Sequence, residues 1–368
     1  TSSITLSDEF LTNNPGVAIT LAAGTISAGA GTTADPTLTE AVAYTAGNGN
    51  IKITTGTADD TFATASGSLI DVSDTINGGT GTDTIAVYND ATFGTTDTAG
   101  DNVTLALDIY HTNIEKVTVV DVATDDTADV TITIAAAYTG TSLEIDASAL
   151  DQNALSTANE ALILSQNTAD TAALTVTGGE GADIITTGAK ADTITGNGGI
   201  DTIITSAGDD SIYGGAGADI ITPGAGKDYA EGGAGNDTFV ISVDADFEVS
   251  GGTETLDGGA GTDTLSFTES GARDISAAEM GSVKNIEVIS IGSGTGAAAT
   301  VIGLGDAFFS NNNDAVSIIA NPTANTAATT KIDGSSVSTG AITLTLKGNI
   351  TATNDTSIGV YGDDTFVV

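Results

Sequence analysis

Aspartate recurs at every ninth residue in one continuous stretch of this 368-residue chain. Residues 178–240 divide without a gap into seven nine-residue units, of which GGAGADIIT is representative. Carboxylates ligate hard cations, and pairs of carboxylates can catalyse glycoside hydrolysis. The pattern therefore suggests two kinds of chemistry, metal binding and acid–base catalysis. The sixth position of every unit is aspartate: Asp183, Asp192, Asp201, Asp210, Asp219, Asp228 and Asp237.

The same period predicts a turn followed by a short strand. Glycines at positions one, two and four permit the positive φ of a tight turn. The last three residues form a strand whose position-eight side chain points inward, so two units complete one flattened coil of a parallel β-roll. Position eight is apolar in every unit: Ile185, Ile194, Ile203, Ile212, Ile221, Ala230 and Phe239.

Stacked coils place like charges side by side. At the ~4.8 Å spacing of neighbouring strands, two carboxylates repel by roughly 3.5 kcal/mol at an effective dielectric near 20. A hard cation that prefers six to eight oxygens relieves this repulsion, with aspartates and turn carbonyls as ligands. Because loops alternate between two edges, we expect one edge to hold Asp183, Asp201, Asp219 and Asp237, and the other Asp192, Asp210 and Asp228. One ion between neighbours on each edge gives about five Ca²⁺ in this block.

Charge and composition limit the classes of molecule that can bind this chain. The chain has 49 acidic and 8 basic residues and a formal net charge of -41. Nucleic acid is a poor partner, because repulsion replaces the counterion release that drives phosphate binding. The absence of cysteine removes disulfides and thiolate chemistry. No stretch approaches about 18 consecutive apolar residues, so we expect no membrane insertion.

Residues that could build a catalytic site are sparse, and we expect that the chain is not an enzyme. His111 is the single histidine, and no nucleophile motif surrounds it. Tryptophan is absent, so the aromatic platforms of sugar-cleaving sites are missing. The glycine loops lack the lysine and serine or threonine of a phosphate-binding loop.

The regions outside the roll repeat a larger phrase. GGTGTDTI at 78–85 and GGAGTDTL at 258–265 are each followed by NIE and a strand. We expect an N-terminal β segment (1–54), a β module (55–177), the roll (178–240), a second β module (241–358) and the start of a further unit (359–368). Short helices are expected within 152–163 and 274–284, and VTITI at 130–134 reads as an amphipathic strand.

Residues 178–240 resemble the repeats-in-toxin (RTX) β-roll, and the flanking modules resemble those of calcium-dependent bacterial surface-layer (S-layer) proteins and large secreted RTX proteins. The fold this implies is all-β, with a parallel β-roll flanked by β-helix or β-sandwich-like modules. Ligand roles carry over to the seven aspartates and, by the same motif, to Asp83 and Asp263. Degenerate units place Asp60, Asp74, Glu254 and Asp364 at the equivalent position.

The resemblance also implies a function. It indicates type I secretion, folding on extracellular calcium, and a structural role at the bacterial cell surface with self-association into a lattice or filament. Two alternatives stay open: an extender region of a giant RTX adhesin, and the RTX region of a secreted enzyme whose catalytic domain lies outside this chain.

Overall fold

The computed structural model describes residues 3–4, 18–20, 24–26, 43–45, 51–54, 59–65, 75–88, 103–120, 129–136, 138–150, 160–170, 172–242, 248–249, 252–268, 273–291, 300–312, 315–320, 330–336, 343–347 and 365–367. The chain divides into two compact units, Thr1–Gly199 and Ile200–Val368. Both are built from short parallel strands that return, coil after coil, to the same sheets.

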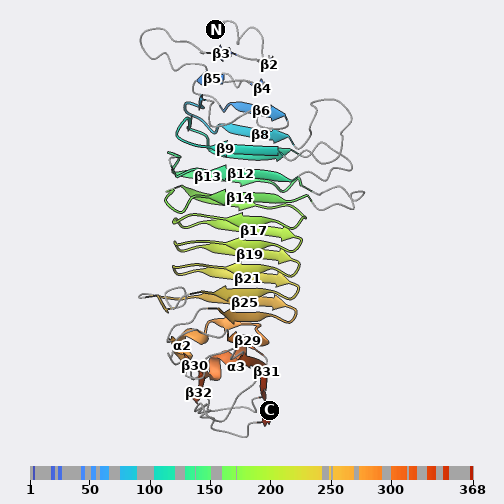
Figure 1. Ribbon diagram of the computed structural model, residues 1–368, viewed down its shortest axis with the longest axis vertical. Helices are drawn as coiled ribbons and strands as arrows, with labels where there is room; N and C mark the ends of the chain where they lie inside the picture. The colour runs from blue at the N-terminus through green and yellow to red at the C-terminus, as the bar shows by residue number, and fades with distance from the viewer. Residues whose placement is uncertain are drawn as a thin grey trace. The chain divides into compact units, whose positions relative to one another are not determined.

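Three series of parallel strands make up the first unit, and Figure 1 shows β12, β14 and their neighbours lying one above another. One series is β1 (Ser3–Ile4), β3 (Gly24–Ile26), β5 (Ile51–Thr54), β7 (Thr75–Asn77) and β10 (His111–Thr112). The second is β2 (Ala18–Thr20), β4 (Ala43–Thr45), β6 (Thr61–Ala65), β8 (Thr84–Tyr88), β11 (Lys116–Val120), β13 (Ser142–Asp146), β15 (Ala173–Thr177) and β17 (Thr193–Gly198). The third is β9 (Val103–Leu107), β12 (Val130–Ile134), β14 (Leu162–Gln166) and β16 (Ile184–Thr186).

The second unit continues the same architecture. One series is β19 (Ser211–Ala216), β21 (Tyr229–Ala234), β25 (Thr255–Ala260) and β28 (Val283–Lys284). The other is β18 (Thr202–Ile204), β20 (Ile220–Thr222), β22 (Thr238–Ile241), β26 (Thr264–Phe267), β29 (Val288–Ile291), β31 (Ala315–Ala320), β33 (Thr343–Lys347) and β34 (Thr365–Val367). A third parallel set is β27 (Arg273–Ile275), β30 (Thr300–Gly305) and β32 (Thr330–Ser336), and an antiparallel pair is β23 (Glu248–Val249) with β24 (Gly252–Thr253).

The core is a column of aliphatic side chains between the two faces of each coil. In the second unit the parallel register places Ile203, Ile221, Phe239, Leu265 and Ile289 directly above one another. All five are 0% exposed. Burying each such side chain contributes roughly 1.5–3 kcal/mol, so the apolar period is the main driving force for stacking. The inward direction expected for position eight is confirmed.

The all-β class and the parallel roll are confirmed. The flanking segments with described strands coil in parallel as well, so of the two forms considered for the modules the β-helix applies to them and the β-sandwich does not. Strand β12 buries Val130, Ile132 and Ile134 on one face, as its alternation predicts.

The two described helices are short, and only the first has a side-chain cap. Helix α2 (Ala277–Met280) lies within the expected stretch 274–284, because Ser276 and Glu279 form a reciprocal capping box. Helix α3 (Asp306–Asn311) was not predicted; its signal is one turn carrying buried Phe308 and Phe309. In the stretch 152–163, residues 152–159 lie outside the described residues, and the helix expected there is wrong at its end, where Leu162 and Ile163 begin β14.

Candidate metal centre

The nine aspartates with predicted ligand roles are all buried. Full burial of a carboxylate is unfavourable unless it is paired, hydrogen-bonded or bound to a metal. None of the nine is more than 2% exposed: Asp83, Asp183, Asp192, Asp201, Asp210, Asp219, Asp228, Asp237 and Asp263. The turns that hold them therefore supply specific partners.

One carboxylate oxygen of seven of these aspartates accepts a main-chain N–H from the preceding coil. In the second unit Asp219 Oδ1 accepts from the Asp201 amide at 2.8 Å, and Asp237 Oδ1 accepts from the Asp219 amide at 2.9 Å. On the other edge Asp228 Oδ1 accepts from the Asp210 amide at 2.8 Å. These separate series confirm the alternation of edges in the second unit. We call each series an aspartate ladder.

The first unit contains the same contact. Asp83 Oδ1 accepts from the Asp60 amide at 2.8 Å. Asp183 and Asp192 accept from the amides of Leu162 and Leu174, each at 2.7 Å. The contact therefore extends to coils whose preceding turn has lost the glycine and aspartate signature.

The second oxygen points toward the first glycine of its own unit. Among the described residues, Oδ2 of Asp83, Asp219, Asp237 and Asp263 is buried without a hydrogen-bond partner. A methyl group added at Gly214 would lie 2.6 Å from Asp219 Oδ2 and 2.5 Å from the Gly232 carbonyl oxygen of the next coil. Position one is thus a small gap between a carboxylate oxygen and a carbonyl oxygen, and glycine keeps it open.

Glycines at positions two and four have a different function, because they set the backbone of the turn. Gly233 and Gly235 have φ of 111° and 143°, values that side-chain-bearing residues rarely adopt. A Cβ at either position would also collide with a main-chain carbonyl of the preceding coil. These glycines therefore permit the tight stacking that brings the oxygens together.

Comparison with protein families identifies this arrangement. The family described as the RTX calcium-binding nonapeptide repeat, in four copies, matches residues 72–88, 177–203, 195–230, 224–240 and 249–266. The chain carries an RTX calcium-binding β-roll. Comparisons with curated proteins and with solved structures gave no significant match.

The residues of the RTX roll fit calcium. The described residues hold no group of three or more histidine, cysteine, aspartate or glutamate side chains placed for one metal ion. An ion would therefore take carboxylate oxygens together with main-chain carbonyls such as that of Gly232, and calcium accepts both kinds of oxygen. Asp83 and Asp263 have the same geometry at Gly78 and Gly258.

Without a cation, the buried carboxylates are easier to protonate than exposed ones. Burial raises the pKa of Asp83 and Asp183 to about 7, and that of Asp219 and Asp263 to about 6. Backbone hydrogen bonds oppose this rise, while neighbouring carboxylates add to it for Asp83, Asp219 and Asp263. A calcium ion supplies the positive charge that keeps these groups ionised at neutral pH.

The other edge of the RTX roll is filled differently. Thr205 stands at position one of its unit, and its hydroxyl donates to the Pro223 carbonyl of the next coil. In the first unit the Thr187 hydroxyl hydrogen-bonds to Asp192. A threonine side chain thus occupies the place that glycine leaves open beside Asp219.

Residues missed in the sequence continue the RTX ladders. Glu287 Oε2 accepts from the Asp263 amide, and Glu115 Oε2 accepts from the Asp83 amide, both at 2.8 Å. Glu254, expected to be a degenerate position, is 1% exposed and accepts from the Asp228 amide at 3.0 Å. The recurrence of NIE after both GGxGTD phrases was the available signal for the first two glutamates.

Position five carries a second contact that the sequence did not reveal. Asp209 Oδ1 accepts from the Lys227 amide at 3.0 Å, and Asn236 Oδ1 accepts from the Thr262 amide at 2.8 Å. Here the acceptor belongs to the earlier coil, whereas in the aspartate ladder it belongs to the later one. The two contacts together hold each turn on both sides.

The remaining candidates have structural places or lie outside the described residues. His111 is 0% exposed, and its Nδ1 lies 3.1 Å from Asp108 Oδ1, as expected for a structural histidine. Asp60 is buried at 2% exposure. Asp74 and Asp364 lie outside the described residues.

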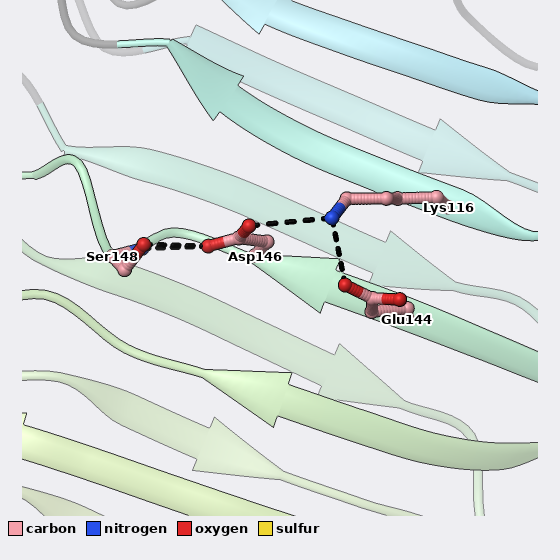
Figure 2. Close-up of polar contacts among 4 residues, drawn as sticks. All are labelled: Lys116, Glu144, Asp146 and Ser148. Atoms are coloured by element: carbon pink, nitrogen blue, oxygen red, sulfur yellow. Dashed lines mark hydrogen bonds and ion pairs between the residues drawn. The ribbon is translucent and has the colours of Figure 1, made fainter.

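One ion-pair cluster lies on the outer face of the first unit. Figure 2 shows Lys116 Nζ between Glu144 Oε1 at 2.7 Å and Asp146 Oδ2 at 3.3 Å. Ser148 donates to the other oxygen of Asp146 at 2.7 Å. All three charged side chains are more than a quarter exposed, so the cluster contributes little to stability.

Proposed function

We propose that this chain is a calcium-folded structural segment of the bacterial cell surface, either of an S-layer or of an extracellular filament. The observation that carries the proposal is the repeated gap between a buried Asp Oδ2 and a main-chain carbonyl, at Gly78, Gly178, Gly214 and Gly258. Calcium at these places is an integral part of the fold, because the same carboxylates also hold the amides of neighbouring coils.

Secretion and folding are linked in this proposal. RTX nonapeptide repeats are typical of proteins exported by type I secretion, which favours an extracellular location. Structural calcium sites of extracellular modules bind with dissociation constants of about 10⁻⁴ to 10⁻³ M, so cytosolic calcium leaves such sites empty. The chain then folds on reaching the outside of the cell.

A structural role, without catalysis, is supported by what occupies the buried polar positions. The described acidic ladders are engaged with main-chain amides of adjacent coils, and the single histidine is buried beside Asp108. No helix in the described part of the chain is long and apolar enough to span a bilayer.

Electron microscopy tests the proposal. Purified protein is imaged by negative stain in about 5 mM calcium and in excess chelator. This calcium concentration lies above the dissociation constants of about 10⁻⁴ to 10⁻³ M typical of extracellular modules. Calcium-dependent sheets or fibres are the expected result. Monomeric rods in calcium would instead favour the extender region of an adhesin and contradict self-assembly by this segment.

A further inference from the structure

The turn that follows each GGxGTD phrase is built twice in the same way. Strand β10 ends opposite Asn77, and strand β28 ends opposite Asp257. The next residue is an asparagine with φ of 52° in both turns, Asn113 and Asn285. Asn113 Nδ2 donates to Asn77 Oδ1 at 2.7 Å, and Asn285 Nδ2 donates to Asp257 Oδ1 at 2.6 Å.

The glutamate of each turn replaces the next aspartate of the ladder. Glu287 Oε2 lies 2.8 Å from the Asp263 amide, the same length as the contact from Asp263 Oδ1 to the Asp237 amide. Glu287 comes two positions after Asn285, whereas Asp237 comes five positions after Gly232. The extra methylene of glutamate allows a shorter turn to place a carboxylate at the equivalent point.

The carbonyl of each asparagine completes the equivalence. A methyl group at Gly258 would overlap both Asp263 Oδ2 and the Asn285 carbonyl oxygen. One at Gly78 would overlap both Asp83 Oδ2 and the Asn113 carbonyl oxygen. These are the counterparts of the carboxylate and carbonyl oxygens that meet at Gly214.

An unsatisfied oxygen is present in each place. Asp83 and Asp263 are 0% exposed, and their Oδ2 atoms have no hydrogen-bond partner among the described residues. A buried carboxylate oxygen left in this state is unfavourable by about 1–3 kcal/mol or more, so a bound cation would stabilise it. The asparagine carbonyl lies across the gap, and the glutamate carboxylate binds the amide of the same aspartate. Oxygens of these two kinds are the ligands of a hard cation.

We propose that each of these turns completes the calcium site beside Asp83 or Asp263, with its glutamate as an additional ligand. The inference rests on calcium binding by the roll and adds residues outside the nine-residue motif. The ligands are Asp83, the Asn113 carbonyl and Glu115 in the first unit, and Asp263, the Asn285 carbonyl and Glu287 in the second.

Glutamine substitution separates ligation from hydrogen bonding. Glu115→Gln and Glu287→Gln retain an oxygen that accepts from the Asp83 or Asp263 amide, so a purely structural contact survives. The negative charge and the bidentate oxygen pair are lost. Matched controls are Glu144→Gln on β13 and Glu231→Gln on β21, which remove one acidic charge each from side chains bound to Lys116 and Tyr229.

Ions are counted by native mass spectrometry and calcium affinities are measured by isothermal titration calorimetry on the full chain. Each ladder substitution is expected to remove one ion or weaken one site at least tenfold, and the double variant two, while the controls keep the wild-type number. An unchanged number and affinity in both variants, with a wild type that binds calcium, would overturn this inference alone. A wild type that binds no calcium would overturn the proposed function as well.

A folding assay supplies a second measurement if a variant is unfolded at about 1 mM calcium, which is the dissociation constant of the weakest extracellular calcium modules. Loss of a ligand weakens the ion without abolishing the fold, so circular dichroism in about 50 mM calcium should recover the wild-type β-signal by mass action. A variant that stays unfolded at high calcium would show a structural role only and overturn the inference.

Discussion

The two edges of the roll in the second unit are built from the same nine-residue phrase but differ at its first position. Beside Asp219 this position is Gly214, and a gap remains between the carboxylate and the Gly232 carbonyl. In the unit of Asp210 it is Thr205, whose hydroxyl binds the Pro223 carbonyl. We call these the glycine edge and the threonine edge.

The difference shows that aspartates in the same phase can have different space beside them. On both edges an Asp Oδ1 holds the amide of the preceding coil, so this contact serves stacking. Room for an ion depends on the residue five positions earlier. We therefore expect the glycine edge to bind calcium more tightly, whereas counting about five ions from the sequence treats the edges as equal.

Removing calcium should have the largest effect. The free energy of metal binding is part of the folding free energy, and each ion at 100 times its dissociation constant adds about 2.7 kcal/mol. Together, several such ions contribute a free energy comparable to the whole stability of an ordinary domain, so excess chelator should abolish the cooperative thermal transition. Circular dichroism in chelator and in calcium provides the measurement.

Hydrogen exchange sharpens this prediction edge by edge. As calcium is lowered, the weaker sites empty first, so the Asp210 amide on the threonine edge should lose protection before the Asp219 amide on the glycine edge. An identical β-signal and Tm in chelator would contradict the central role of calcium.

Exchanging the first residue between the edges should have the next largest effect. Gly214→Thr places a side chain against Asp219 Oδ2 and the Gly232 carbonyl, so we expect the loss of one ion and a decrease of at least about 2 kcal/mol in unfolding free energy in calcium. Thr205→Gly removes one hydrogen bond and should cost about 1 kcal/mol. Denaturant unfolding and ion counting test both, and equal effects would remove the distinction between the edges.

Neutralising one aspartate on each edge should have a smaller effect. Asp219→Asn and Asp228→Asn both keep an acceptor for the amide of the preceding coil, so they mainly remove a charged ligand. We expect calcium affinity to fall at least tenfold for Asp219→Asn and by less for Asp228→Asn. Calorimetric titration measures the affinities, and a larger loss for Asp228→Asn would reverse the assignment of the tighter edge.

The pH dependence of the calcium-free roll should be the mildest effect and the opposite of the usual one for carboxylates. The pKa of Asp219 and Asp263 is raised from 3.8 to about 6 by burial. Between these values the folded chain binds more protons than the unfolded chain, so stability is fully present below about pH 4 and is lost as pH rises through about 6.

Thermal melts at pH 5 and pH 8 test the sign. Calcium is removed beforehand on a chelating resin, since soluble chelators lose affinity in acid. We expect a weak thermal transition at pH 5, where protonation stabilises the calcium-free fold, and none at pH 8, and we expect saturating calcium to reduce the difference because the ion competes with the protons. A higher Tm at pH 8 without calcium would contradict the burial of these carboxylates in the calcium-free fold.

The fold and much of the candidate site could be predicted because both follow from a strict period. Ile221 and Phe239 lie in the core column, and Asp219 and Asp237 share one ladder, as the nine-residue repeat requires. Which first-position residues leave room for an ion could not be predicted, because that depends on the carbonyl of the next coil. Glu115 and Glu287 were not predicted for a similar reason. Their turns are shorter, so these carboxylates do not follow the nine-residue spacing although they reach the equivalent place in the ladder.

The position-six contact also explains how the roll accommodates added segments. It joins residues 18 apart between Asp210 and Asp228, 23 apart between Asp60 and Asp83, and 26 apart between Asp237 and Asp263. The hydrogen-bonded register is therefore independent of the length of chain between coils. The antiparallel pair β23–β24 lies in one of the longer connections without changing the register of β22 with β26. In evolution and in engineering alike, such connections are places where new loops can be introduced while the calcium-bearing turns keep their positions.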